Sequence, residues 1–167
     1  MNRIGMLIDL SHVSDQTMKH SIRISEAPVI FSHSSVLSIN SLKRNVPDDV
    51  LKLVKKNNGV VMINFYSGYV APDAEIEKNP KALGTLNGVV DHIEHVIKTI
   101  GVDHVGIGSD YDGVSRLPVG LESVATYPRI TQQLLNRGYK KSDIHKILGG
   151  NVMRVLEEAE QVAKESR

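Results

Sequence analysis

The sequence predicts an α/β fold built on a parallel sheet, and two observations carry that prediction. Short apolar runs alternate four times with longer segments of helical character along the 167 residues. The runs are nearly continuously apolar, as in parallel strands whose two faces are both covered by helices. Successive strand–helix units with right-handed crossovers place their strands parallel to one another. We therefore expect one domain with one core, residues 1–167.

The first two units occupy the N-terminal third of the chain. Residues 4–10 form the first apolar run, and a polar helical segment follows at about 14–25. The second run is 28–31. Proline and two acids at 47–49 predict a helix start, because proline fits a first helical turn and acids favour the positive end of the helix dipole. The Asn-Asn-Gly at 57–59 is typical of a helix end.

The third and fourth units follow the same order. The third run is 60–66, a polar loop is expected over 68–84, and the fourth run is 105–108. Between the loop and the fourth run, apolar residues at helical spacing predict one amphipathic helix; they are Leu86, Val89, Val90, Ile93, Val96, Ile97 and Ile100. The remainder is expected to be mostly helical, with an apolar face formed by Ile144, Ile147, Leu148, Val152, Val155, Leu156 and Ala159.

Two parallel architectures are compatible with these units. One is an open, doubly wound sheet. The other is part of a (β/α)8 barrel, which normally needs about 250 residues. Since this chain contains only four units, the barrel interpretation makes it a half-barrel.

Composition and charge exclude several classes of function. The net charge is +1 with seven histidines neutral, so nucleic acid is not an expected partner. Cysteine is absent, so a transition metal must bind through His, Asp or Glu. No run approaches the roughly 20 apolar residues of a membrane span, and neither a signal peptide nor a lipid-anchor tail is recognisable. The compartment is not indicated.

Polar side chains follow each apolar run, where the strands of a parallel sheet end; in order they are His12, His33, Asn64 with Tyr66, and Asp110 with Asp112. This edge carries the active site of parallel α/β folds. Imidazole is a zinc ligand, and carboxylates bind metals or transfer protons. A lone strand-end histidine is more often structural. Two histidines and an aspartate on one edge leave the structural and metal-binding interpretations equally weighted.

The other motifs are weaker indications of function. His92 and His95 lie three residues apart on the amphipathic helix, off its apolar stripe, and are expected to face solvent. Gly106 and Gly108 suggest a phosphate loop only weakly, since no third glycine and no helix start follow. Close packing inside a barrel, or room for a site, explains these glycines better.

Five segments occur in this order along the chain: LIDLSHVS, PVIFSHSS, RNVPDD, GSDYDG and LGGN. Together they resemble the membrane (renal) dipeptidase family. Residues 7–14 (LIDLSHVS) and 28–35 (PVIFSHSS) are similar to the two segments that carry successive zinc histidines in that family. Residues 44–49 (RNVPDD) resemble its substrate-arginine segment, and 108–113 (GSDYDG) its catalytic-aspartate turn. Residues 148–151 (LGGN) resemble its closing element. The likeness covers essentially the whole chain.

The resemblance implies a fold, a reaction and a set of site residues. The implied fold is the C-terminal half of a (β/α)8 barrel with two zinc ions in the complete site, and the implied reaction is zinc-dependent hydrolysis of a dipeptide, with a D-residue tolerated at its C-terminal position. His12 and His33 would ligate the second zinc. Arg44 would bind the dipeptide carboxylate, and Asp110 would contact the substrate and assist proton transfer.

Part of the family's metal site has no counterpart in these residues. The family binds its first zinc through a His-x-Asp and bridges both ions with a glutamate; no His-x-Asp occurs here, and Asp9 and Asp112 do not match the bridging position. We therefore expect a partial barrel domain over 1–167 that lacks its N-terminal strands, an internal or mis-assigned Met1, and poor or absent activity in isolation.

The function, the preferred dipeptide and the oligomeric state stay open at this stage. A non-catalytic α/β half-domain that acts through binding or assembly is one alternative function. Another metal-dependent barrel hydrolase is a second, which Arg44 weakens because that segment is specific to substrates with a carboxylate. The preferred dipeptide is not indicated, and a homodimer is an open alternative for the oligomeric state.

Overall fold

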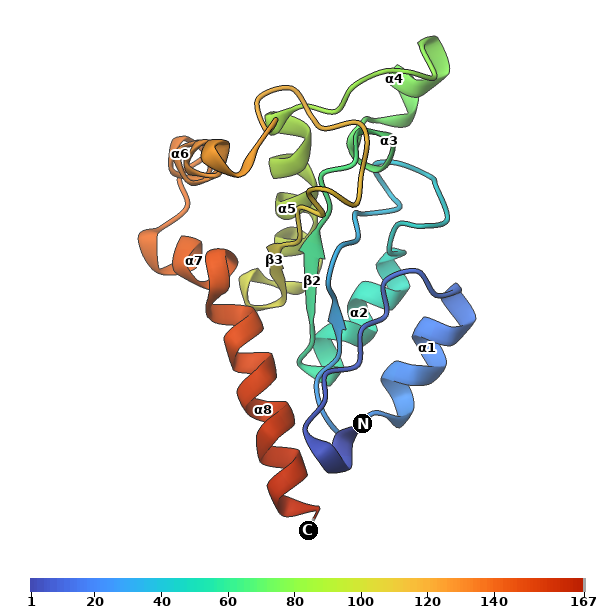
Figure 1. Ribbon diagram of the computed structural model, residues 1–167, viewed down its shortest axis with the longest axis vertical. Helices are drawn as coiled ribbons and strands as arrows, with labels where there is room; N and C mark the ends of the chain where they lie inside the picture. Colours follow the sequence, from blue (N-terminus) through green and yellow to red (C-terminus); the bar gives the residue numbers. More distant parts are fainter. Residues whose placement is uncertain (167) are drawn as a thin grey trace.

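The computed structural model describes residues 1–166 and shows helices arranged around a parallel three-stranded sheet (Figure 1). The strands are β1 (Ile30–Phe31), β2 (Val60–Ile63) and β3 (Val105–Ile107), hydrogen-bonded in the order β1-β2-β3. Both neighbouring pairs are parallel. The prediction of a parallel α/β fold is confirmed.

The first apolar run, residues 4–10, is only partly a strand. Leu10 N–H donates to the Ile30 carbonyl at 2.8 Å, and Ile30 N–H donates to the Ile8 carbonyl at 2.9 Å, so the run lies parallel beside β1. Met6, however, is 53% exposed. The expectation of a fully buried strand was wrong, because the pairing begins only after the first half of the run.

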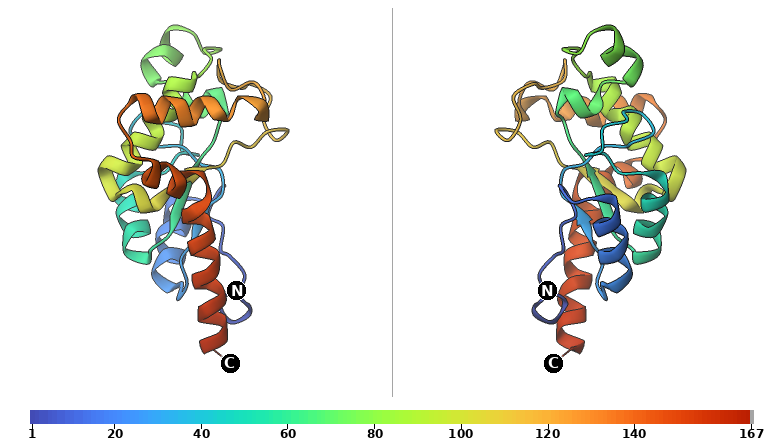
Figure 2. Two further views of the ribbon diagram at one scale, coloured as in Figure 1. Left: turned by 90° about the vertical axis from the view of Figure 1, so that its left-hand side faces the viewer. Right: turned by 90° about the vertical axis from the view of Figure 1, so that its right-hand side faces the viewer.

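Three helices lie where the sequence predicts them: α1 (Asp15–Ile24), α2 (Asp48–Asn57) and α5 (Leu86–Ile100). The side chain of Ser14 accepts the Thr17 N–H at the start of α1, which satisfies a free donor of the first turn. Asn58, in the left-handed region at φ 63°, ends α2. The three helices stand in a row along one side of the sheet (Figure 2).

The predicted loop at 68–84 contains two short helices, α3 (Ser67–Val70) and α4 (Asp73–Lys78). The expectation of a plain loop was therefore wrong in this part. Pro72 precedes α4, and Asp73 and Glu75 lie in its first turn, a local start signal that a polar and proline-containing segment obscures.

The C-terminal part is mostly helical, as predicted. Its elements are η3 (Val124–Thr126), α6 (Pro128–Asn136), α7 (Lys141–His145), η4 (Lys146–Gly150) and α8 (Asn151–Glu165). Two further short helices lie earlier in the chain, η1 (Asn2–Ile4) and η2 (Val102–His104). Gly149 has non-helical backbone angles and interrupts the path from α7 to α8. Ile147 and Val155 of the predicted apolar face are buried, whereas Leu148, beside the interruption, is 45% exposed.

Alternate residues of β2 face two different parts of the core. Val61 and Ile63 pack in the main cluster with the apolar side chains of α2 and α5. Val60 packs on the other face with Ile30 and with Val155 of α8. This alternation is the period of a strand covered on both faces.

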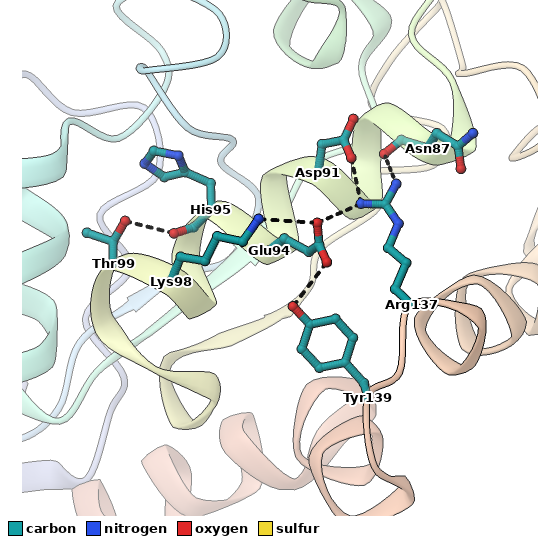
Figure 3. A network of polar contacts seen from close by, with 8 residues as sticks. All are labelled: Asn87, Asp91, Glu94, His95, Lys98, Thr99, Arg137 and Tyr139. Atoms are coloured by element: carbon teal, nitrogen blue, oxygen red, sulfur yellow. Dashed lines mark hydrogen bonds and ion pairs between the residues drawn. The ribbon is translucent and has the colours of Figure 1, made fainter.

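A polar network ties α5 to the segment between α6 and α7 (Figure 3). Arg137 Nη1 donates to Asp91 Oδ1 at 2.6 Å and to Glu94 Oε2 at 2.8 Å. The Tyr139 hydroxyl donates to Glu94 Oε1 at 3.2 Å. The network fixes the outer side of α5, while its inner side packs on the sheet. Within residues 1–166, no helix is both long and apolar enough to cross a membrane.

Candidate metal and substrate site

His12 and His33 come together at the carboxyl edge of the sheet. His12 follows the segment paired with β1 and has a left-handed backbone with φ 70°, and His33 follows β1 itself. Their Nε2 atoms are 2.9 Å apart, and their ring centroids are 4.9 Å apart. The structure thus places two imidazole nitrogens from neighbouring parallel segments at one point.

The far side of the His33 ring is held by a serine and a carboxylate. Ser32 Oγ lies 2.7 Å from His33 Nδ1 and donates to Asp9 Oδ2 at 2.5 Å. Asp9 Oδ1 accepts the backbone N–H groups of Ser11 and Ser32, both at 3.0 Å. Burial raises the pKa of Asp9, but these hydrogen bonds outweigh burial and hold the pKa below its ordinary value.

Electrostatics at the site favour a neutral His12. Burial lowers the pKa of His12, and Arg44 and His33 lower it further, against the opposing effect of Asp110 and Asp9. Burial lowers the pKa of Arg44 overall, and the charge of Asp110 acts in the opposite direction. The neutral imidazole is the form that binds a metal ion.

Arg44 is held in place from below by the loop that follows β1. Its Nη1 donates to Ser34 Oγ at 2.6 Å, and its Nη2 donates to the His33 carbonyl oxygen at 2.8 Å. The guanidinium carbon lies 5.7 Å from the centre of the Tyr69 ring. Each Nη atom carries two N–H groups, so one on each remains for an anion.

Asp110 is oriented by a buried amide. Asn64, which follows β2, donates from Nδ2 to Asp110 Oδ2 at 3.0 Å and accepts the Tyr66 backbone N–H through Oδ1. Asp110 follows β3 and has a left-handed backbone with φ 62°. Its carboxylate raises the pKa of His12, against the larger lowering effects of burial and Arg44.

The segments that follow β1 and β3 approach each other closely. A Cβ atom on Gly108 would lie 2.0 Å from the backbone oxygen of Ser32, so no larger residue fits there without movement of the segment after β1. Close packing therefore explains Gly108, and its place inside a barrel stays a prediction.

The two histidines fit part of a metal site. Within residues 1–166, neither Nε2 atom has a further hydrogen-bond partner, which leaves two nitrogen donors at a shared point. Their separation is close to the roughly 3.3 Å between nitrogens on a tetrahedral zinc ion at about 2.0 Å bond length. No cluster of three or more His, Asp or Glu side chains suited to a metal occurs in the described part of the chain. The residues therefore fit two ligands of a larger set.

Comparisons with known proteins identify the family of this chain. A sequence model of the membrane dipeptidases, peptidase family M19, matches residues 1–167. This chain belongs to the membrane dipeptidase family.

Solved structures similar to this chain include three dipeptidase or peptidase structures. A metallo peptidase from Rhodobacter sphaeroides, liganded with a phosphinate mimic of the dipeptide L-Ala-D-Ala, is 28% identical with a TM-score of 0.85; 95% of this chain covers 44% of that one. The probable dipeptidase PvdM from Pseudomonas aeruginosa is 26% identical with a TM-score of 0.86; the match covers 97% of this chain and 52% of that one. The dipeptidase AC, a family M19 metallo peptidase, is 29% identical with a TM-score of 0.86, at 95% and 45% coverage. The chain therefore spans about half the length of the membrane dipeptidase relatives it matches.

The histidines of α5 differ from the sequence prediction. His92 is fully buried, accepts the Val36 N–H at Nδ1 at 3.0 Å and lies with Nε2 3.2 Å from the Val70 carbonyl. The expected solvated position was wrong, because the loop after β1 and helix α3 cover this side of α5. Burial is the largest cause that lowers the pKa of His92 to about 4. His95 is partly exposed, with Nε2 2.8 Å from Asp48 Oδ1.

Sequence patterns pointed to His12, His33, Arg44 and Asp110 but not to the groups that hold them. Asp9 and Ser32 lie 23 residues apart, and only the pairing of their two segments brings them together. The signal for Ser32 was its place beside His33 at the end of an apolar run.

Proposed function

We propose that this chain forms the carboxyl-terminal half of a zinc-dependent dipeptidase and carries part of its metal site and its substrate arginine. The convergence of His12 Nε2 and His33 Nε2 at 2.9 Å supports this function more than any other observation. Hydrolysis of the single peptide bond of a dipeptide is the reaction, and the family membership supports that reaction class.

The fold we propose for the complete protein is a (β/α)8 barrel, of which residues 1–167 form one half of the barrel domain. Two observations support it. The relatives are about twice as long as the matched region, and α1, α2 and α5 stand in a row along one side of a parallel sheet, as in a barrel wall (Figure 2).

The metal we propose is zinc, with His12 and His33 as two of its ligands and the remaining ligands supplied from outside these 167 residues. Catalytic zinc sites usually have three protein ligands, so two imidazoles alone make an incomplete site. A bound zinc ion supplies Lewis-acid polarisation of the scissile carbonyl and activation of water. We therefore expect weak or no turnover from this chain alone.

Arg44 is proposed to bind the carboxylate of the dipeptide. Two of its N–H groups already hold Ser34 Oγ and the His33 carbonyl, so the guanidinium is fixed before substrate arrives. Its remaining Nη hydrogens can form a two-point contact with a planar carboxylate. The phosphinate dipeptide mimic bound by the Rhodobacter sphaeroides relative supports a dipeptide as the ligand class.

Asp110 is proposed to hold and transfer the proton that hydrolysis moves from the attacking water to the leaving amine. Asn64 fixes one carboxylate oxygen of Asp110 and leaves the other for a substrate or a water molecule. Asp110 follows β3 at the carboxyl edge of the sheet, the edge where His12 and His33 also lie, and this shared edge supports the role.

The test combines this chain with the N-terminal half of a family member and measures L-Ala-D-Ala hydrolysis with zinc present. We expect turnover from the combination, its loss with a chelator, and little from the chain alone. Arg44→Lys should raise KM by about tenfold or more, since an ammonium cannot make the two-point contact. Lys43→Arg, at the neighbouring exposed position, is the matched control.

Three results would contradict the proposal. Full turnover by this chain alone would refute the incomplete site. A combined form that folds but binds no zinc would favour a non-catalytic half-domain. Equal KM values for Arg44→Lys and Lys43→Arg would remove Arg44 from the substrate site.

A further inference from the structure

A continuous hydrogen-bonded chain connects a carboxylate to the far side of the His33 ring. Asp9 Oδ2 is 2.5 Å from Ser32 Oγ, and Ser32 Oγ is 2.7 Å from His33 Nδ1. His33 Nε2, on the opposite side of the ring, faces His12. Whatever fixes the proton at Nδ1 therefore determines what Nε2 can do.

The direction of each hydrogen bond follows from the donors present. An ionised carboxylate only accepts, so the Ser32 hydroxyl must donate its single proton to Asp9. The oxygen of Ser32 can then only accept from His33 Nδ1, which requires the ring proton on Nδ1. In this tautomer Nε2 carries a free lone pair, directed at the point where His12 Nε2 also lies.

We propose that Asp9 and Ser32 are positioning residues that hold His33 as its Nδ1–H tautomer and so present the Nε2 lone pair to a metal ion. The metal part of this inference rests on the proposed function, whereas the tautomer part does not. Partners of this kind orient metal-binding histidines and typically affect metal affinity about 10–100-fold.

The backbone makes the direction of the chain dependent on the charge of Asp9. Asp9 Oδ1 accepts two backbone N–H groups, from Ser11 and Ser32, each at 3.0 Å. In Asp9→Asn these two donors keep the amide oxygen at that position and leave the amide NH2 facing Ser32 Oγ. Ser32 would then accept from the amide and donate to His33 Nδ1, so the ring proton would move to Nε2.

The primary test is the tautomer of His33 in the metal-free chain, measured by NMR with 15N-labelled histidine. At about pH 8 imidazoles are neutral, and a protonated ring nitrogen is readily distinguished from an unprotonated one by its chemical shift. We expect His33 to carry its proton on Nδ1. A proton on Nε2 in the unmodified chain would overturn the proposal without any variant.

Variants test the cause of that tautomer. Asp9→Asn should move the His33 proton to Nε2, and Ser32→Ala should leave a mixture, while Ser32→Thr should retain Nδ1–H because it keeps the hydroxyl. The matched controls are Ser38→Ala and Asp48→Asn, since Ser38 Oγ donates to Asp48 Oδ1 at 2.9 Å in another serine–carboxylate pair. Neither control should change the His33 tautomer.

Zinc titration with a competing chelator dye gives the second readout. Asp9→Asn and Ser32→Ala should weaken zinc binding about 10–100-fold, and Ser32→Thr should restore it. An unchanged tautomer in folded Asp9→Asn, or an altered tautomer with unchanged zinc affinity, would overturn the inference. A correct tautomer pattern in a chain that binds no zinc would instead contradict the proposed function.

Discussion

Two sets of histidines in this molecule differ in the hydrogen bonds of their ring nitrogens, and this difference distinguishes a structural histidine from one that can bind a ligand. His92 lies within the core, and both of its ring nitrogens have backbone partners, the Val36 N–H and the Val70 carbonyl. His12 and His33 lie at the carboxyl edge of the sheet, and their Nε2 atoms face each other. An imidazole whose two nitrogens both have hydrogen-bond partners cannot bind a further ligand. Two imidazole nitrogens that face each other can bind one together.

The comparison also shows why position on an apolar stripe is a weak guide to the role of a histidine. His92 does not belong to the apolar stripe predicted for α5, yet it is buried and contacts both the loop after β1 and helix α3. We do not expect it to bind a ligand. His33 is held from behind by Ser32, so that only one of its ring nitrogens remains available. The state of both ring nitrogens is therefore more informative than burial alone.

The largest expected effect comes from the facing pair. His33→Ala should lower zinc affinity by about 100-fold or more, because it removes one of the two nitrogen donors, and should change the free energy of unfolding by less than about 1 kcal/mol. Competition with a chelator dye and urea unfolding measure the two quantities. A His33→Ala chain with unchanged zinc affinity would break the comparison.

The second effect is a loss of stability at the buried histidine, with zinc affinity unchanged. His92→Ala should reduce the free energy of unfolding by about 3 kcal/mol, because it leaves a buried N–H and carbonyl without partners and opens a cavity. Urea denaturation measures the loss. Zinc affinity of the folded fraction should stay within about twofold of the parent chain, because His92 contributes no ligand. Little loss of stability would show that His92 is not a structural tie.

The third effect is a pH dependence that belongs to His92. Its pKa in the folded chain is about 4, against 6.5 for an ordinary histidine, mainly because of burial. Between these values the unfolded chain binds more protons, so stability is complete above about pH 6.5 and declines as the pH falls toward 4, by up to about 3 kcal/mol. Urea denaturation series at several pH values should show this slope, and His92→Ala should flatten it.

The smallest effect is expected at His95. Its Nε2 lies 2.8 Å from Asp48 Oδ1, but both side chains are partly exposed. His95→Ala should cost less than about 1 kcal/mol and leave zinc binding unchanged. It is the matched control for His92→Ala on the same helix, and a loss as large as that of His92→Ala would contradict the distinction between bonded core and surface histidines.

The sequence predicted the elements whose signals are local. The starts and ends of α1, α2 and α5 follow from residues such as Ser14 and Asn58, and the parallel order follows from repeated strand–helix units. The proximity of His12 and His33 was also predicted, since each follows a strand-like run in a parallel sheet, and the 2.9 Å contact confirms it. Their role as metal ligands stays a proposal.

What the sequence could not predict depends on contacts between distant segments. Met6 and Leu148 are apolar but exposed, because strand pairing begins late in the first run and Gly149 interrupts the last helices. The burial of His92 depends on a loop and a short helix that fold over α5. The partnership of Asp9 with Ser32 exists only once their segments lie side by side.

The left-handed backbone at His12 and Asp110 carries a consequence for how this edge is maintained. Such a conformation costs most residues with a side chain about 1 kcal/mol, and aspartate less, whereas glycine would adopt it freely. A scaffold selected only to fold would gain from glycine at both positions. The imidazole of His12 and the carboxylate of Asp110 therefore lower the stability of the fold relative to glycine, which fits a molecule that uses both side chains.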